Sequence, residues 1–434
     1  MKAKAFVLVL LISSALNAQD SLFTLREAVD MALRQNLEIQ IANSELEITK
    51  INNNWGNAGA LPTLIGNISN TNAVSNIDQK LANGSSIQRN NVSNSNLNAN
   101  LGISWKIFNG LRVRASKERF ESLEKIGALA LNQQIDQIVF DVISTYYNLI
   151  RLKKQILATK ALIALSEERL KIAQTRLDVG SAAKTDLLQA SIDLNAQMVN
   201  LTELNNQISD TKSLINTILK RSIAEPFVAT QEQFMIPDLS YTDIIDRFEK
   251  QNPQLLIAQL EKHNLLTERK IINAQRIPSL SINSTTTLNR SSSKAGFFLT
   301  NKTFGPNIGV GLGIPIFAGN VTKTELKVNS VLQKRQDLQI DQIKTIILRD
   351  LYIAYQDFEH SLSLIKVEEK NIKLAEENNM IATERFRKLQ TNSIELRQAQ
   401  LSLIEAQDRF IQAQYRAQLA AMTMKFLSGE ITKF

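Results

Sequence analysis

The chain contains no cysteine among its 434 residues. This absence excludes disulfide bonds, thiolate metal sites and the N-terminal cysteine that would carry a lipid anchor. Only two histidines occur, His263 and His360, and they lie far apart in the sequence. No phosphate-binding loop, metal-ligand cluster or Ser/His/Asp grouping accompanies them. The sequence therefore predicts no enzyme, no cofactor and no resident metal.

Long hydrophobic runs are also missing beyond the N-terminus, where no stretch reaches the ~20 apolar residues of a membrane-spanning helix. The N-terminus itself resembles a secretory signal, because Lys2 and Lys4 precede an apolar run over 5–12 and small residues before Ala18. We expect residues 1–19 to be a signal peptide. A short buried helix is the alternative interpretation.

Charge of one sign is not concentrated anywhere along the predicted helices. The formal net charge is +8, but basic residues alternate with acids, as in Arg26-Glu27 and over residues 167–169. Such mixing is typical of solvated helix faces. We therefore expect no nucleic-acid partner.

Proline and glycine are scarce over two long stretches. Residues 320–428 contain neither, and residues 111–225 contain no proline and only Gly127 and Gly180. Because these residues interrupt helices, their absence predicts very long ones. A helix over 111–178 would extend roughly 100 Å at 1.5 Å per residue.

Shorter helices are predicted beside the long ones. A return helix over 185–220 would extend roughly half as far. Another helix is expected over residues 24–58, because Thr24 and Glu27 have the spacing of a capping box.

The sequence is internally duplicated. A shift of 209 positions places residues 107–110 on 316–319 and Arg176 on Arg385, and a shift of 216 places Asn36 on Asn252. We expect a first repeat over 20–220, a proline-containing linker at mid-height over 221–240, and a second repeat over 241–434. Such an internal duplication indicates a symmetric assembly of repeated structural units.

Alternating sequences precede the long helix in each repeat. Apolar residues occupy every second position in residues 97–107 and 307–316. Residues 279–283 also alternate, and residues 64–68 do so more weakly. Segments of ~10 residues with one apolar face are typical of transmembrane β-barrel strands. A half-buried soluble sheet is the alternative. The side chains expected to face lipid are Leu101, Ile103, Leu312 and Ile314, and those expected to face the lumen are Asn100 and Ser104.

The strands are expected in pairs, joined by solvent-exposed loops at 75–94 and 290–302, where Asn, Ser and Thr abound. A sheet in a membrane must close on itself, because every backbone group needs a partner. Four strands are too few, since closed barrels begin at eight. Several copies of the chain must therefore contribute to one barrel.

The chain resembles the TolC-like outer-membrane efflux protein family over essentially the whole mature length. The motifs that carry the resemblance are residues 25–28 with Asn36, Leu61-Pro62, residues 108–110 and 317–319, residues 176–180, and residues 186–190. The chain differs from the family pattern at four positions near the expected hairpin tips. The family often has tyrosine at the positions of Leu177 and Phe386, glycine at the position of Leu389 and a basic residue at the position of Thr391.

The resemblance implies a mixed α+β membrane protein. Three copies would form a 12-stranded outer-membrane β-barrel, with four strands from each protomer, continuous with a long α-helical barrel in the periplasm. The homotrimer would sit among outer-membrane lipids and dock on a periplasmic adaptor, itself coupled to an inner-membrane transporter. It would be the passive exit duct of a tripartite efflux or type I secretion system. A structural or adhesive coiled-coil protein of the envelope is the alternative.

The periplasmic entrance is expected at two helical-hairpin tips. The helix-forming sequence is interrupted near Gly180 and again near residues 391–393. Asp186 and Glu395 follow these interruptions at equivalent positions of the repeat, and the resemblance places both at the entrance and adaptor-docking tip. Three copies of each would form acidic rings that attract cations. Alternatively, both acids merely stabilise the first turns of their helices through the helix dipole.

Overall fold

The computed structural model describes residues 22–230, 233–234, 236–237, 239–294 and 298–432. The expected signal peptide, 1–19, lies outside these residues. The chain forms two compact units. The hairpin unit comprises Met1–Asn43, Leu131–Pro253 and Lys344–Phe434, and the sheet unit comprises Ser44–Ala130 and Gln254–Ile343. Each unit draws segments from both sequence repeats, so a repeat is not by itself a compact unit.

The chain combines long helices with long strands, as the sequence predicted. In the first half the elements are β1 (Leu22–Phe23), α1 (Leu25–Gln35), α2 (Leu37–Asn52), β2 (Thr63–Lys80), β3 (Ser86–Asn109), α3 (Arg112–Asp178), α4 (Lys184–Ile218) and β4 (Val228–Ala229). In the second half they are α5 (Tyr241–Gln251), α6 (Pro253–Ala274), β5 (Ser279–Ser293), β6 (Thr300–Gly313), α7 (Val321–Arg387) and α8 (Ser393–Ser428).

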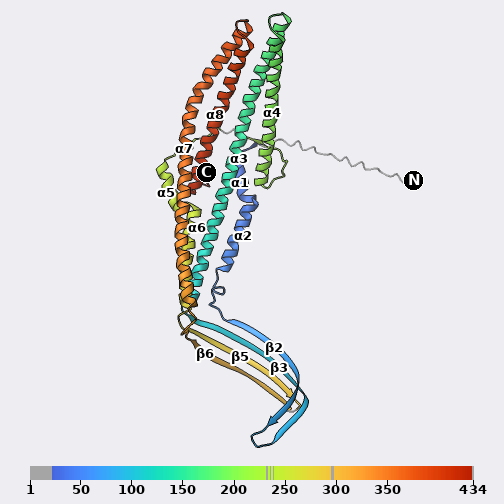
Figure 1. Ribbon diagram of the computed structural model, residues 1–434, viewed down its shortest axis with the longest axis vertical. Coiled ribbons are helices and arrows are strands. Elements are labelled where there is room, and N and C mark those ends of the chain that lie inside the picture. The colour runs from blue at the N-terminus through green and yellow to red at the C-terminus, as the bar shows by residue number, and fades with distance from the viewer. Residues whose placement is uncertain (1–21, 231–232, 235, 238, 295–297, 433–434) are drawn as a thin grey trace, which may run out of the picture. The chain divides into compact units, whose positions relative to one another are not determined.

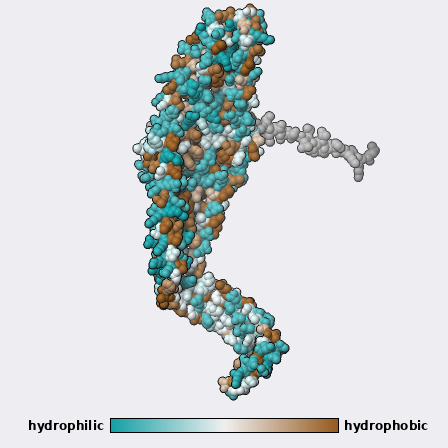
Figure 2. Space-filling view, in the orientation of Figure 1, coloured by the Kyte–Doolittle hydropathy of each residue, from teal (hydrophilic) through white to brown (hydrophobic). Residues whose placement is uncertain are grey.

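Two helical hairpins dominate the hairpin unit, and Figure 1 shows α3 beside α4 and α7 beside α8. Helices α3 and α7 each contain 67 residues, and both pass through the two units. Helices α4 and α8 contain 35 and 36 residues. None of the described helices has the length and apolar character that a membrane span requires. Figure 2 accordingly shows hydrophobic patches interspersed with hydrophilic surface over the hairpins.

The duplication is visible in equivalent side-chain contacts. The Asn36 side-chain amide donates to the Ile218 carbonyl at 2.9 Å, and the Asn252 amide donates to the Leu427 carbonyl, also at 2.9 Å. These pairs are related by the sequence shifts of 216 and 209. Each asparagine thus joins the end of a short helix to the end of a return helix within the hairpin unit.

The single helix expected over 24–58 is wrong. The chain forms α1 and α2 instead, separated at Asn36, whose ψ of 133° is not helical. The Asn36 side-chain oxygen accepts from the backbone N–H groups of Glu38 and Ile39, at 2.8 and 3.2 Å. It therefore caps α2, because such an oxygen satisfies donors that lack a partner within the helix. The capping box expected at Thr24 and Glu27 is present at the start of α1.

A short parallel pairing holds the segment before α1 in the hairpin unit. Leu22 and Phe23 pair with Val228 and Ala229. The Tyr146 hydroxyl donates to the Phe23 carbonyl at 2.8 Å, and the Phe23 ring meets the fully buried Phe227 ring edge-on at 5.5 Å.

The sheet unit contains one antiparallel sheet in the order β2-β3-β5-β6 (Figure 1). The loops expected at 75–94 and 290–302 are wrong, because most of these residues continue the strands, although most of the described ones are solvent-exposed as expected. The first connection shrinks to residues 81–85, and in the second pair β5 extends to Ser293 and β6 begins at Thr300. Asn, Ser and Thr are common in loops, but here their backbones pair across the hairpins, from Lys80 with Ser86 onwards.

Register gives the sheet two chemically distinct faces. Directly opposed residues share a face, and alternate residues lie on opposite faces. The apolar face carries Leu64, Ile68, Leu97, Ala99, Leu101, Ile103, Trp105, Leu280, Ile282, Ser284, Thr286, Leu288, Phe304, Pro306, Ile308, Val310 and Leu312. The polar face carries Asn67, Ser69, Asn98, Asn100, Gly102, Ser104, Lys106, Ser281, Asn283, Thr285, Thr287, Asn289, Thr303 and Asn307, together with one apolar residue on β2, Ile65.

Amide and hydroxyl contacts link the strands on the polar face. The Asn67 amide donates to the Asn100 side-chain oxygen at 3.1 Å, and the Ser104 hydroxyl donates to the Asn283 side-chain oxygen at 2.8 Å. Ile314 lies outside β6, which ends at Gly313, although the sequence pattern extended this strand to residue 316. Pro315 follows directly and has no N–H group to continue the ladder.

Candidate functional site

The first hairpin tip depends on a glycine. Helix α3 ends at Asp178, and Gly180 adopts a φ of +71°, where a hypothetical Cβ would meet nothing within 4 Å. The N–H groups of Gly180 and Ser181 donate to the carbonyls of Leu177 and Arg176 at 2.9 and 2.8 Å. Glycine adopts this left-handed conformation without steric cost, so the chain can reverse here.

The second tip has the same backbone path but different side chains. Leu389 occupies the position of Gly180 in the repeat and has a φ of +63°. The side chain of Asn392 caps α8, because its oxygen accepts from the N–H groups of Ile394 and Glu395 at 3.2 and 3.0 Å. The equivalent cap position of α4 is Ala183, which provides no side-chain bond.

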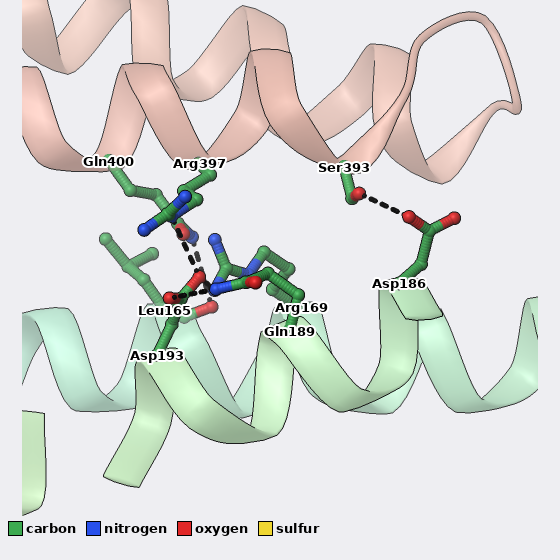
Figure 3. A network of polar contacts seen from close by, with 8 residues as sticks. All are labelled: Leu165, Arg169, Asp186, Gln189, Asp193, Ser393, Arg397 and Gln400. Carbon is green, nitrogen blue, oxygen red and sulfur yellow. Dashed lines mark hydrogen bonds and ion pairs between the residues drawn. The ribbon is translucent and has the colours of Figure 1, made fainter. Parts of the chain in front are cut away.

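The two predicted acids have different partners. Glu395 forms an ion pair with Arg385 of its own hairpin and also accepts from the Thr391 hydroxyl. Asp186 instead accepts from the Ser393 hydroxyl of the other hairpin at 2.9 Å (Figure 3). Gly180, Asp186 and Glu395 therefore all lie at the tips, in hairpins that contact one another.

A charged cluster joins three helices farther from the tips. One oxygen of the Asp193 carboxylate on α4 lies 2.5 Å from the Arg169 guanidinium on α3 and 3.0 Å from that of Arg397 on α8 (Figure 3). The other oxygen accepts from the Gln189 amide at 2.9 Å. The Arg169 side chain is only 4% exposed, so its charge depends on this carboxylate for compensation. We call Arg169, Asp193 and Arg397 the charge cluster.

Sequence reasoning missed the charge cluster. Its members break the internal repeat, since Arg169 aligns with Asn378, Asp193 with Ser402, and Arg397 with Leu188. These departures from the repeat were the available signal. They do not reveal the contacts, because each partner comes from a different helix.

Other contacts also cross between the hairpins. The Arg387 side chain on α7 forms an ion pair with Glu168 on α3. The Arg176 guanidinium lies 4.7 Å from the centre of the Phe386 ring and donates to the Thr391 carbonyl at 3.4 Å.

A groove of about 770 Å³ lies beside these contacts, between α3 and α7. Its apolar lining includes Ile172, Val179 and Leu389, and its charged lining includes Glu167, Lys171 and Arg387. Val179 and Leu389 are 70% and 58% exposed, so the tips present apolar side chains to solvent.

Elsewhere in the described chain, no group of three or more acids or histidines has a geometry suited to a metal ion. His263 lies 3.2 Å from the Glu118 carboxylate, which also accepts from the Lys270 ammonium at 2.8 Å. The Lys270 ammonium lowers the pKa of Glu118. These contacts between α3 and α6 have the character of helix-packing ion pairs.

The sequence matches the outer membrane efflux protein family over residues 18–219 and 244–430. Outer membrane efflux protein BepC of Brucella suis biovar 1 is 19% identical over 331 residues, which are 75% of this chain and 70% of BepC.

Solved structures of outer-membrane channels share the fold. The outer membrane protein VceC of Vibrio cholerae gives a TM-score of 0.79 at 14% identity, covering 93% of this chain and 96% of VceC. The CmeC outer membrane channel of Campylobacter jejuni gives 0.78 at 15% identity, covering 94% and 85% of the two chains. The family match includes both hairpins and all four strands of the sheet, and the chain therefore belongs to the outer membrane efflux protein family.

Proposed function

We propose that three copies of this outer membrane efflux protein form a closed duct through which cargo leaves the cell. The observation that carries the proposal is the open four-stranded sheet with one apolar face and one polar face. Strands β2 and β6 each have one unpaired edge among the described residues. A sheet that spans a bilayer has no such edges, because lipid offers no hydrogen bonds.

Three copies are the number that the family resemblance implies. They would supply twelve strands, an even number above the minimum of eight for a closed barrel. The apolar face, including Leu101, Ile103 and Leu312, would meet outer-membrane lipid, and Ile314 would lie just beyond the strand end. The polar face, including Asn100 and Ser104, would line the lumen.

The hairpin tips would form the periplasmic entrance. Asp186 and Glu395 would each contribute three carboxylates around the pore, and negative charge close to a narrow opening attracts cations and repels anions. Asp186 would contribute the stronger field, since no cation is paired with it among the described residues, whereas Arg385 partly neutralises Glu395. Gly180 would allow a partner backbone to approach the first tip closely.

The groove between α3 and α7 would receive a periplasmic adaptor. Its exposed apolar side chains, Val179 and Leu389, are bordered by charges of both signs. This combination suits an amphipathic helix, which places its apolar face in a groove. The adaptor would link the duct to an inner-membrane transporter that supplies the energy.

Single-channel recording in a planar bilayer tests the proposal. The chain is expected to conduct, and the double variant Asp186→Asn with Glu395→Gln is expected to lose cation selectivity and block by multivalent cations. Asp210→Asn is the control, because this exposed acid lies on α4 far from the tip sequence. Wild-type selectivity and block in the double variant would mean that the two acids stabilise their helices only and that the entrance lies elsewhere.

A further inference from the structure

We propose that Arg290 and Lys302 form a binding site for the phosphate-bearing headgroup of an anionic membrane lipid. The inference rests on the proposed function, because it requires that the apolar face of the sheet meets lipid. Arg290 lies on β5 and Lys302 lies directly opposite on β6. Both side chains are exposed, and neither has an ion-pair partner in the described part of the chain.

The two cations lie on the apolar face rather than the polar one. Arg290 also pairs with Leu97 on β3, and the next residues toward the helices on this face are Leu288 and Phe304. At the same level the polar face carries only uncharged groups, including Asn98, Asn289 and Thr303. The cations therefore continue a band of apolar side chains.

The length of this band matches a bilayer. Leu280 begins it on β5, and ten residues at ~3.3 Å each extend about 33 Å along the strand to Arg290. At the tilt of ~40° found in outer-membrane barrels the rise is about 25 Å, which is the height of their apolar band. Trp105 lies near the other end, opposite Ile282. Arg290 and Lys302 would thus reach the headgroup layer on the side of the strand connections.

The charge balance of the sheet points to an anionic ligand. The strands with their connections, residues 63–109 and 279–313, contain six cations and a single acid, Asp78. Asp78 already accepts from the Gln88 amide at 2.9 Å. Like charges directly opposite on neighbouring strands destabilise a sheet. A phosphate between Arg290 and Lys302 would remove that repulsion and form charge-assisted hydrogen bonds with both.

A lipid fits this site better than a free anion does. The exposed Leu288 and Phe304 side chains, 45% and 72% accessible, adjoin the cations on the same face. Acyl chains would cover these side chains while the phosphate contacts the charges. A free phosphate would leave them uncovered.

Native mass spectrometry of the detergent-solubilised protein tests the site. The probes are phosphatidylglycerol and phosphatidylcholine with identical acyl chains. We expect preferential retention of phosphatidylglycerol. The double variant Arg290→Gln with Lys302→Gln is expected to weaken that retention about thirtyfold, from the usual contribution of two cations near an anionic surface. The exchange variant Arg290→Lys with Lys302→Arg is expected to keep it.

Lys106→Gln is the matched control, because it removes a cation from the polar face of the same sheet, and it is expected to retain phosphatidylglycerol as the wild type does. Equal retention of the two lipids, or an equal loss in Lys106→Gln, would overturn the proposal. Displacement of phosphatidylglycerol by an equal concentration of inorganic phosphate would show a free-anion site and overturn it too. The conductance of the double variant Arg290→Gln with Lys302→Gln is also measured in a planar bilayer. A variant that conducts but no longer retains phosphatidylglycerol has an intact duct, so the lipid site and the channel are tested separately.

Discussion

At the scale of single residues, the two tips adopt one turn geometry with two different side chains. Gly180 and Leu389 both have positive φ, which costs a residue with a Cβ on the order of 1 kcal/mol or more. Gly180→Ala is therefore expected to loosen the first tip, since no contact can offset the strain. Amide hydrogen exchange near residues 176–186 should accelerate about fivefold.

Leu389→Gly is the reverse change and relieves strain at the second tip. In this variant the backbone amides of the second tip are expected to exchange no faster than in the wild type. The lower strain of the folded tip offsets the greater conformational freedom that glycine gives the unfolded chain. Faster exchange in Leu389→Gly than in Gly180→Ala would show that the Leu389 side chain, rather than its backbone, holds the tip.

The buried carboxyl group of Asp136 makes the stability of the hairpin unit depend on pH. Burial raises the pKa of Asp136 to about 6, although a hydrogen bond with Thr432 opposes the shift. The folded state therefore binds a proton more readily than the unfolded state. The acid costs stability above pH 6, and this cost disappears as the pH falls through 6 toward the ordinary value of about 4.

Asp136→Asn is thus expected to raise the midpoint of thermal unfolding at pH 7.5, with a gain of at most about 3 kcal/mol, and to have little effect at pH 4. Asp357→Asn, an exposed acid on α7, serves as the control. An equal shift at both pH values would refute the assignment.

At the scale of elements, the charge cluster is expected to hold the two hairpins together. Asp193→Asn leaves the Arg169 charge buried without compensation, and such a loss typically costs about 3–5 kcal/mol. Arg397→Leu introduces the residue found at the equivalent position 188. It leaves the Arg169–Asp193 pair intact and removes only a partly exposed partner, so it should cost less than about 1 kcal/mol.

Thermal unfolding of the two single variants measures this difference. If Asp193→Asn and Arg397→Leu lowered the free energy of unfolding equally, Arg397, and not Arg169, would be the main partner of Asp193. The double variant should lose no more than Asp193→Asn alone, since Arg397 then has no carboxylate to contact in the cluster.

Helices were the most predictable elements. The ends of α3 and α4 lie within two residues of the expected ones, because the two helices contain no proline and only one glycine, Gly127, and because Gly180 marks the turn between them. The separation of α1 from α2 was missed, since side-chain bonds of Asn36 produce it without a proline. The outer parts of all four strands were missed, because residues with polar side chains on both faces resemble a loop until their backbones pair.

Part of the candidate site was predictable for the same reason. The interruptions near Gly180 and residues 391–393 and the duplication together located both tips. Asp186 and Glu395 follow these interruptions, and their role at an entrance, which the family resemblance implies, stays a prediction. The charge cluster could not be predicted from the sequence, because the proximity of Arg169, Asp193 and Arg397 depends on how α3, α4 and α8 pack. Which acid contacts the other hairpin also depends on packing, as the different partners of Asp186 and Glu395 illustrate.

At the scale of the whole molecule, family membership agrees with the sequence-based prediction of an outer-membrane efflux channel component that is not an enzyme. The alternative, an envelope coiled coil, is not favoured, because the match to the outer membrane efflux protein family includes the four strands of the sheet as well as both helical hairpins.

The two faces of the sheet predict how the assembled channel tolerates charge. Ile103→Arg and Leu312→Arg would each place a cation on the face expected to meet lipid, at a cost of roughly 2–4 kcal/mol near the bilayer midplane. Ser104→Arg would place the same cation toward water and should leave assembly nearly unchanged. Gel electrophoresis of the membrane-extracted protein, with and without prior heating, measures assembly. If Ser104→Arg disrupts assembly and Ile103→Arg does not, the face that carries Ser104 meets lipid and the assignment of the two faces is inverted.

In the proposed channel, copies of this chain close one another's sheets into one barrel. Native mass spectrometry of the protein extracted from the outer membrane in mild detergent tests it most directly. We expect a single species containing three chains, since four strands from each chain complete a barrel of twelve. A monodisperse single chain that remains rich in β-structure and conducts ions in a bilayer would contradict it.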